Sequence, residues 1–260
     1  MTNPHGTPIW YELQTHDPDA AKAFYDAVIG WTVAAPPPGP MDYRMIETGG
    51  GPVGGVMRLS DEMTAGGAKP GWMVYIGVDD VEASAKAIEA AGGAIVMGPW
   101  DLPDIGRMAV ATDPQGVPFY IMRGASDEDS RAFDRDALGK GSWNELVTSD
   151  QAAANAFYGE VFGWTYPDRM TMPGDMGDYI FVAAGDATIG ATMKADPNGP
   201  PPGWTFYFRA RDIDAAAATV SARGGTVHMG PVEVPGGDRI IVASDPHGAR
   251  FGVVAAGAAA

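Results

Sequence analysis

The chain has 260 residues and a mass of 27.1 kDa, which is long for one compact domain and suits two domains of roughly 100–150 residues. Seventeen Lys and Arg stand against 33 Asp and Glu, and the net charge of −16 disfavours nucleic acid and anionic membranes as partners. Cysteine is absent, which excludes disulfides and thiolate metal sites. No apolar stretch is long enough to span a bilayer, so we expect a cytoplasmic protein.

The first elements follow from hydrophobic periodicity and capping residues. Residues 9–15 alternate in a way that predicts a strand. Asp17 predicts the start of a helix, an apolar stripe follows at helical spacing, and Gly30 predicts its end. Three short strands are then predicted over 31–34, 41–47 and 53–59.

The same order of elements follows a second time. A strand is predicted over 72–78, and either Asp79 or Asp80 caps a helix that ends at Gly92-Gly93. Strands over 94–97, 107–112 and 117–122 complete this part. The first half of the chain therefore contains two modules, each a strand, a helix and three strands.

The second half of the chain repeats the first. Trp10-Tyr11-Glu12-Leu13 recurs as Trp143-Asn144-Glu145-Leu146, at an offset of 133 residues. Downstream landmarks such as Asp113-Pro114 and Asp245-Pro246 are separated by 132 residues. So constant an offset predicts two copies of one domain. We place the domains at 1–123 and 142–260, joined by a charged linker over 124–141.

These landmarks carry a family resemblance. The pattern Trp-x-Glu-Leu, Ala-x-Phe-Tyr, Gly-Trp and Asp-Pro-x-Gly resembles the vicinal oxygen chelate (VOC) superfamily, which includes glyoxalases, bleomycin-resistance proteins and extradiol dioxygenases. The resemblance implies an α+β fold of two tandem glyoxalase-like domains, each of paired βαβββ modules forming a half-open barrel. It also implies a small organic ligand or substrate. Because duplication places two domains in one chain, we expect a monomer or a weak homodimer.

The resemblance also indicates where a divalent metal ion would bind. Enzymes of this superfamily use His or Glu on the first strand of each module and a carboxylate on the last. The corresponding positions here are Trp10, Met73 and Tyr120 in the first copy and Trp143, Thr205 and Gly252 in the second. None of these residues is a ligand for a hard or borderline cation. We therefore predict no metal and no other cofactor.

Strand alternation predicts which side chains face each cavity. Trp10 and Glu12 share one face of the first strand, as Trp143 and Glu145 do in the second copy. Glu12 and Glu145 are candidate catalytic bases, or groups that bind a substrate hydroxyl or amine. The alternative is a structural glutamate that caps backbone amides or pairs with Arg107 or Arg239.

Other candidate ligand-binding residues lie on the same predicted faces. They are Met73, Tyr75, Pro118, Tyr120 and Met122 in the first copy, Thr205, Tyr207, Arg209 and Arg250 in the second, and Tyr43 and Tyr179 on middle strands. The first set favours a flat apolar ligand, and the two guanidiniums of the second suit a carboxylate or phenolate. Alternatively, the aromatic rings fill an inert barrel, and the arginines pair with Glu145 or reach solvent.

Three functions remain open at this point. The first is a metal-free protein that binds a small apolar or aromatic molecule. The second is a metal-free enzyme that uses Glu12 or Glu145 as a general base in isomerase, lyase or ring-opening chemistry. The third is a metal-dependent lactoylglutathione lyase or dioxygenase with an unorthodox metal site.

Overall fold

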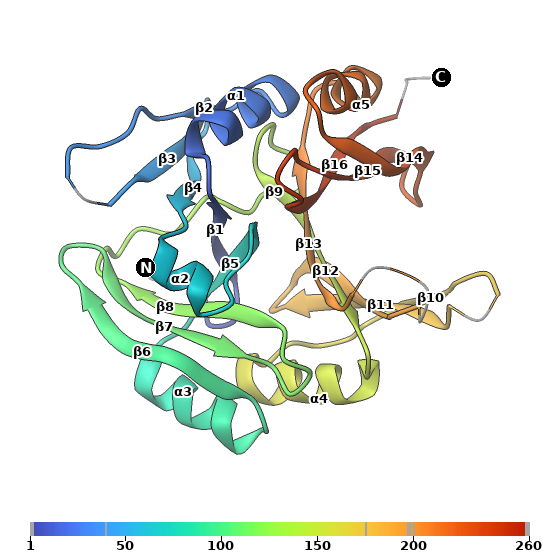
Figure 1. Cartoon of the computed structure of the whole chain (residues 1–260). Coiled ribbons are helices and arrows are strands. Elements are labelled where there is room, and N and C mark those ends of the chain that lie inside the picture. Colours follow the sequence, from blue (N-terminus) through green and yellow to red (C-terminus); the bar gives the residue numbers. More distant parts are fainter. Residues whose placement is uncertain (1–2, 40, 175, 197–198, 200, 258–260) are drawn as a thin grey trace. The chain divides into compact units, whose positions relative to one another are not determined.

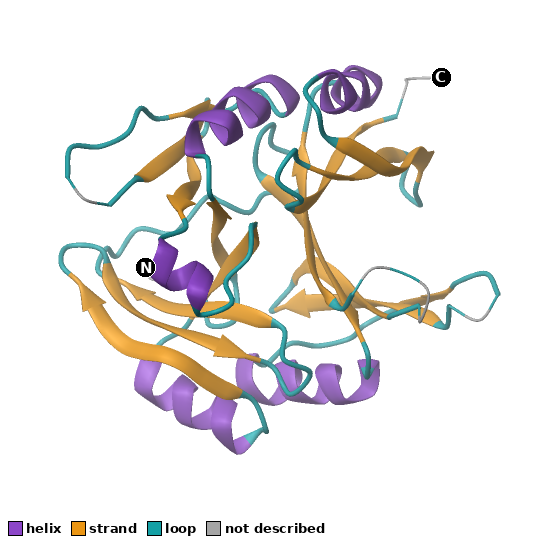
Figure 2. Cartoon of the chain, in the orientation of Figure 1, coloured by secondary structure: helices purple, strands orange, loops and turns teal. Residues whose placement is uncertain are grey.

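The computed structural model describes residues 3–39, 41–174, 176–196, 199 and 201–257 (Figure 1). The first copy contains β1 (Pro8–Thr15), α1 (Pro18–Val28), β2 (Thr32–Val33), β3 (Tyr43–Thr48), β4 (Gly51–Arg58), α2 (Asp61–Ala65), β5 (Gly71–Gly77), α3 (Val81–Ala90), β6 (Ala94–Leu102), β7 (Gly106–Thr112) and β8 (Pro118–Gly124). The second contains β9 (Gly141–Thr148), α4 (Gln151–Phe162), β10 (Arg169–Thr171), β11 (Asp178–Ala184), β12 (Ala187–Lys194), β13 (Gly203–Arg209), α5 (Ile213–Ala222), β14 (Thr226–Glu233), β15 (Asp238–Ser244) and β16 (Arg250–Ala256). The predicted βαβββ order is confirmed in all four modules, and α2 is an addition that the sequence reasoning missed (Figure 2).

The four module helices begin at aspartate caps. Asp17, Asp80, Asp150 and Asp212 each accept hydrogen bonds from backbone N–H groups in the first helical turn. These N–H groups have no partner within the helix, so the carboxylate stabilises the helix start. The prediction of Asp17 is confirmed, and Asp80 rather than Asp79 caps α3.

Among the described residues, the strands form two eight-stranded sheets. Their orders are β2-β3-β4-β1-β5-β8-β7-β6 and β10-β11-β12-β9-β13-β16-β15-β14. β1 runs parallel to β4 and β9 runs parallel to β12, with Glu12 opposite Gly55 and Glu145 opposite Ala191. The α+β fold of two tandem domains is therefore confirmed. The Gly-Pro bonds at Gly98-Pro99 and Gly230-Pro231 are cis in both copies, which extends the sequence repeat to the backbone.

The described chain divides into two compact units that each take one module from each copy. The first unit comprises Met1–Ile9, Met73–Ser130 and Trp143–Trp204, and so contains β5–β8 together with β9–β12. The second comprises Trp10–Trp72, Arg131–Ser142 and Thr205–Ala260, with β1–β4 and β13–β16. Helices α3 and α4 lie side by side in the first unit, and α1 and α5 do so in the second (Figure 1).

A buried tyrosine–aspartate pair joins the two copies within each unit. Tyr158 on α4 lies 3.3 Å from Asp113 of the first copy's Asp-Pro-x-Gly turn, measured from the phenol oxygen to Oδ2. In the other unit, Tyr25 on α1 lies 3.2 Å from Asp245. Burial raises the pKa of both carboxyl groups. The turn of each copy thus anchors the first helix of the other.

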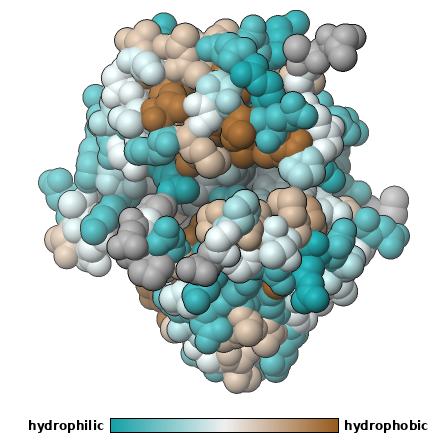
Figure 3. Space-filling model, turned by 90° about the vertical axis from the view of Figure 1, so that its right-hand side faces the viewer, coloured by the Kyte–Doolittle hydropathy of each residue, from teal (hydrophilic) through white to brown (hydrophobic). Residues whose placement is uncertain are grey.

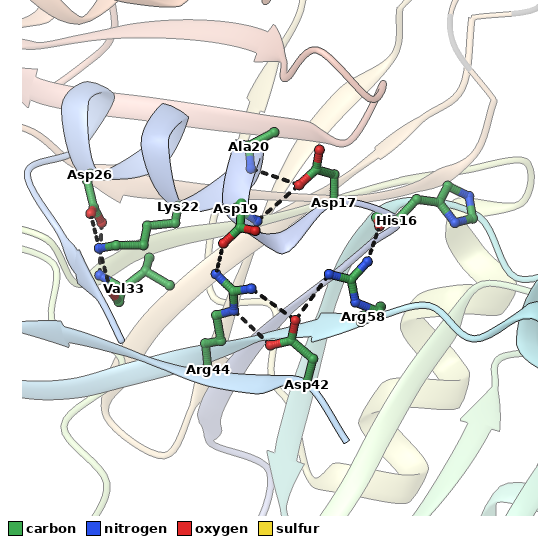
Figure 4. A network of polar contacts seen from close by, with 10 residues as sticks. All are labelled: His16, Asp17, Asp19, Ala20, Lys22, Asp26, Val33, Asp42, Arg44 and Arg58. Carbon is green, nitrogen blue, oxygen red and sulfur yellow. Dashed lines mark hydrogen bonds and ion pairs between the residues drawn. The ribbon is translucent and has the colours of Figure 1, made fainter. Parts of the chain in front are cut away.

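A charged network in the second unit fastens α1 to β3. The guanidinium of Arg44 is 2% exposed and donates to both oxygens of Asp42, at 2.7 and 2.9 Å, and to Asp19 at 2.7 Å (Figure 4). Arg58 adds a longer contact of 3.3 Å to Asp42. A buried guanidinium that is held by two carboxylates through three charge-assisted hydrogen bonds stabilises the fold, so its role here is structural.

One end of the predicted linker is held by a buried lysine. Lys140 is 2% exposed, and its ammonium donates to the backbone carbonyls of Gly50, Gly51 and Pro52 at 3.1–3.2 Å. Burial lowers the pKa of Lys140. The hydrogen bonds of Lys140 therefore attach this end of the linker to the hairpin between β3 and β4.

Candidate functional site

In the first unit, one face of β5–β8 packs against α3 and the opposite face is rich in Met and aromatic rings. Ile76, Phe119 and Ile121 on the α3 side are fully buried. The register of the strands places the following residues together on the other face: Met73, Tyr75, Met97, Trp100, Met108, Tyr120 and Met122. We call this set the methionine–aromatic face. Met97 is 57% exposed, while Met73, Trp100 and Met122 are half-buried.

A tyrosine stack forms part of the methionine–aromatic face. Tyr75 and Tyr120 are register partners on β5 and β8, and their ring centroids lie 4.1 Å apart with planes inclined by 11°. The two phenol rings are therefore stacked face to face, and each also carries a polar hydroxyl. The register of β5 and β8 brings together four residues that the sequence placed on one face: Met73, Tyr75, Tyr120 and Met122. Sequence reasoning missed Met97, Trp100 and Met108, and plain alternation could not have placed Met97 and Trp100 on one face, because β6 has register shifts between Ile95 and Met97 and between Met97 and Trp100.

In the second unit, β13–β16 carry the matching face with different chemistry. Met229, Val232, Ile240, Val242 and Val254 occupy the positions of Met97, Trp100, Met108, Val110 and Met122. Hydrophobic side chains gather in the upper part of Figure 3, where these strands lie, and Met229 and Val232 are 45% and 43% exposed. We call this set the aliphatic face.

Tyr207 on β13 lies at one edge of the aliphatic face. A Cβ atom at Gly252, its register partner, would lie 2.2 Å from the Tyr207 ring. Real Cβ atoms do not approach other atoms so closely, so the ring rests directly on the Gly252 backbone. A larger residue at Gly252 is excluded unless Tyr207 moves.

The two arginines predicted for the second copy differ in their partners. Arg209 donates through its Nη2 to Asp238 at 2.6 Å and through Nε to the carbonyl of Arg135. Its charge is therefore already neutralised within the protein. Arg250 is half-buried, and its Nε donates to the hydroxyl of Thr205 at 3.0 Å. Within the part of the chain that the structure describes, no acidic side chain pairs with Arg250.

The first strand of each copy presents a tryptophan–tyrosine pair. In the second unit, Trp10 on β1 donates through Nε1 to the Tyr43 hydroxyl at 2.7 Å. Tyr43 lies flat on Gly55, where an added Cβ would be 2.3 Å from its ring. Gln14 donates to Oε1 of Glu12 at 3.1 Å. Trp10 and Glu12 on β1 and Tyr43 on β3 thus belong to one module, and the Tyr43 side chain crosses β4 to reach Trp10.

The second copy extends this pair into a chain that reaches a carboxylate. Trp143 donates through Nε1 to the Tyr179 hydroxyl at 2.8 Å, and Tyr179 donates to Oε2 of Glu145 at 2.9 Å. Trp143 and Tyr179 are half-buried, and Glu145 is 8% exposed. Phe181 flanks both aromatic rings at centroid distances of 5.9 and 5.8 Å. Glu145 is thereby oriented by a phenol.

The predicted arginine partners of these glutamates bind elsewhere. Arg107 pairs with Glu82 of α3 and Asp101 of β6. Arg239 pairs with Asp214 of α5, on the opposite side of its sheet from the aliphatic face. Neither arginine supplies the structural partner that sequence reasoning offered for Glu12 and Glu145.

The residues at the positions where this fold would hold a metal ion do not fit one. Trp10, Met73, Tyr120, Trp143, Thr205 and Gly252 offer no imidazole or carboxylate. The Tyr207 ring covers the backbone of Gly252, which leaves no room for a ligating side chain. Across residues 3–257, apart from the few positions left undescribed, no three His, Asp or Glu residues gather into a possible metal cluster.

The fold and repeat define the class of this protein. Residues 8–121 and 142–253 match the family model of the Glyoxalase/Bleomycin resistance protein/Dioxygenase superfamily, and the chain belongs to that family. Among the helices that the structure describes, none has the length and apolarity needed to cross a membrane.

Named relatives cover nearly the whole chain. It is 36% identical over 259 residues to "Putative glyoxylase CFP32" of Mycobacterium tuberculosis, covering 96% of this chain and 94% of the relative. It is 32% identical over 266 residues to "Anthracycline biosynthesis protein DnrV" of Streptomyces peucetius, covering 96% and 93%. The Mn(II)-bound glyoxalase from Novosphingobium aromaticivorans shares the fold, with a TM-score of 0.67, 19% identity and coverage of 96% and 82%.

Proposed function

We propose that this protein binds a small, flat, largely apolar aromatic molecule on the methionine–aromatic face, without a metal ion. The observation that carries the proposal is the composition of that face. Half-buried Trp100 offers a flat surface beside the largely buried Tyr75–Tyr120 stack, and the methionines around them are flexible and polarisable. Such a surface adapts to different ring systems, while a rigid aliphatic wall would not.

The chemistry of the family positions and of the relatives supports this proposal. The six positions that would hold a metal ion carry no imidazole or carboxylate, so binding by chelation has no donors there. One relative is named for anthracycline biosynthesis. Anthracyclines contain a flat anthraquinone, which is the kind of ring system that the methionine–aromatic face would accept.

The test is a calorimetric titration with a neutral anthraquinone such as 1,4-dihydroxyanthraquinone, with and without EDTA. Trp100→Val replaces the indole by the residue that the second copy has at Val232, so the variant is expected to fold. Loss of stacking and of buried ring area should weaken binding about tenfold. Val232→Ala is the matched control in the other copy and should leave the affinity unchanged. Absence of binding, binding that EDTA abolishes, or an unchanged affinity in Trp100→Val would each contradict the proposal.

A second candidate function is metal-free catalysis by Glu145. The chain from Trp143 through Tyr179 to Glu145 supports it, because the hydrogen bond from the phenol orients a largely buried carboxylate. Glu12 in the first copy accepts a hydrogen bond from Gln14. With any ligand found by titration, mass spectrometry would show conversion that Glu145→Gln removes while binding persists. Conversion that survives in Glu145→Gln would eliminate this role.

A further inference from the structure

The two copies differ in charge at the start of their last strand. Arg250 begins β16 at the place that Pro118 holds in β8, and Thr205 stands where the first copy has Met73. The methionine–aromatic face therefore has no charge at this end, and the aliphatic face has a guanidinium.

Arg250 is available to a ligand, whereas Arg209 is not. The guanidinium of Arg209 already donates hydrogen bonds to Asp238 and to the backbone carbonyl of Arg135. Arg250 has its Nε on the Thr205 hydroxyl, and among the described residues no carboxylate pairs with its two terminal nitrogens. A guanidinium that keeps two parallel donors matches a carboxylate in a bidentate geometry.

The surroundings of Arg250 suit an apolar body attached to that anion. Gly252 follows two residues later on the same face, about 7 Å along the strand. Its row across the sheet is Tyr207, Gly252, Val242 and Met229. Met229 is 45% exposed, whereas Tyr207 and Val242 are 3% exposed, so the apolar part of a molecule with a carboxylate on Arg250 would contact this row chiefly through Met229.

We propose that the aliphatic face of the second copy is a distinct site for a small monocarboxylate with an apolar or aromatic body, selected by Arg250. This site is separate from the methionine–aromatic face, and the two copies would accept ligands of different charge from one duplicated scaffold. In a chain of net charge −16, a guanidinium that no described carboxylate neutralises favours the approach of an anion at this place.

The test uses two probes of the same shape, 2-naphthoate and neutral 2-naphthamide, titrated by calorimetry at low and high salt. The wild-type protein should bind the naphthoate roughly tenfold more tightly than the amide, as expected for a charge-assisted bidentate contact. Arg250→Gln should remove this preference while the melting temperature stays near that of the wild type. Arg239→Gln is the matched control, because it removes the same charge from the opposite side of the same sheet and should keep the preference.

The outcomes separate this proposal from the one made for the first copy. Equal binding of the two probes, no binding of naphthoate, or a preference that survives in Arg250→Gln would overturn it. None of these results depends on the anthraquinone titration of the Trp100→Val variant, which tests the methionine–aromatic face alone.

Discussion

Replacing Arg44 by methionine tests whether the charged network of Figure 4 stabilises the fold. Methionine keeps the apolar stem and removes the guanidinium, leaving Asp42, 16% exposed, with only the longer contact to Arg58. Loss of one partner of a buried ion pair costs about 3–5 kcal/mol because the other charge stays buried. Since Arg58 and solvent reach Asp42, we expect the lower end, about 3 kcal/mol of the free energy of unfolding.

Asp19→Asn provides the matched control in the same network. The Asp19 side chain is 78% exposed, so its ion pair with Arg44 is screened by water and is worth less than about 1 kcal/mol. Urea unfolding of the wild type and both variants, followed by tryptophan fluorescence, gives the three free energies. A loss below about 1 kcal/mol in Arg44→Met, or equal losses in the two variants, would refute this reasoning.

The network also predicts a pH dependence. Hydrogen bonds from Arg44 lower the pKa of Asp42, so the folded carboxylate releases its proton at a lower pH than the unfolded one. The stability that this provides is fully present above the ordinary aspartate pKa of about 3.9 and is lost as the pH falls through the lowered value. Arg44→Met should therefore cost less stability at pH 2 than at pH 6. An equal cost at both pH values would contradict this sign.

Two further predictions concern the backbone and a buried carboxyl group. Gly54→Ala should prevent folding or lower the melting temperature steeply, because its Cβ would lie 1.9 Å from the Tyr11 carbonyl oxygen. Gly71→Ala is the control and should be tolerated, because no atom would lie closer than 3.9 Å to its Cβ. Asp113 beside Tyr158 has a pKa raised by burial, so its contribution to stability is present at low pH and is lost as the pH rises through that value. In thermal unfolding, the melting temperature of Asp113→Asn should therefore rise relative to that of the wild type as the pH increases from 4 to 7. A difference in melting temperature that does not change with pH would show that Asp113 is not the titrating group.

Local signals in the sequence were sufficient for the elements and for the repeat. Aspartate caps, apolar stripes and strand alternation depend on residues a few positions apart, and α1 and α3 follow the prediction closely. The short helix α2 was missed because none of its residues is buried, so it carries no apolar stripe.

The same alternation placed most of the candidate site. Trp10 and Glu12 share a face because side chains on a strand have a period of two, whereas the pairing of β5 with β8 brings Tyr75 and Tyr120 together. Periodicity cannot, however, say which strands are hydrogen-bonded to each other. It therefore did not show that Tyr179 donates to Glu145 or that Tyr207 lies on Gly252.

The sequence by itself determined the modules, their duplication and the side-chain types on each face. Tertiary structure decided that compact units combine modules of different copies, that Asp238 neutralises Arg209, and that Arg250 donates to Thr205. The physical reason is that capping and amphipathicity act within a few residues of chain. Ion pairs and buried hydrogen bonds depend on which distant groups meet, and only the folded chain fixes those distances.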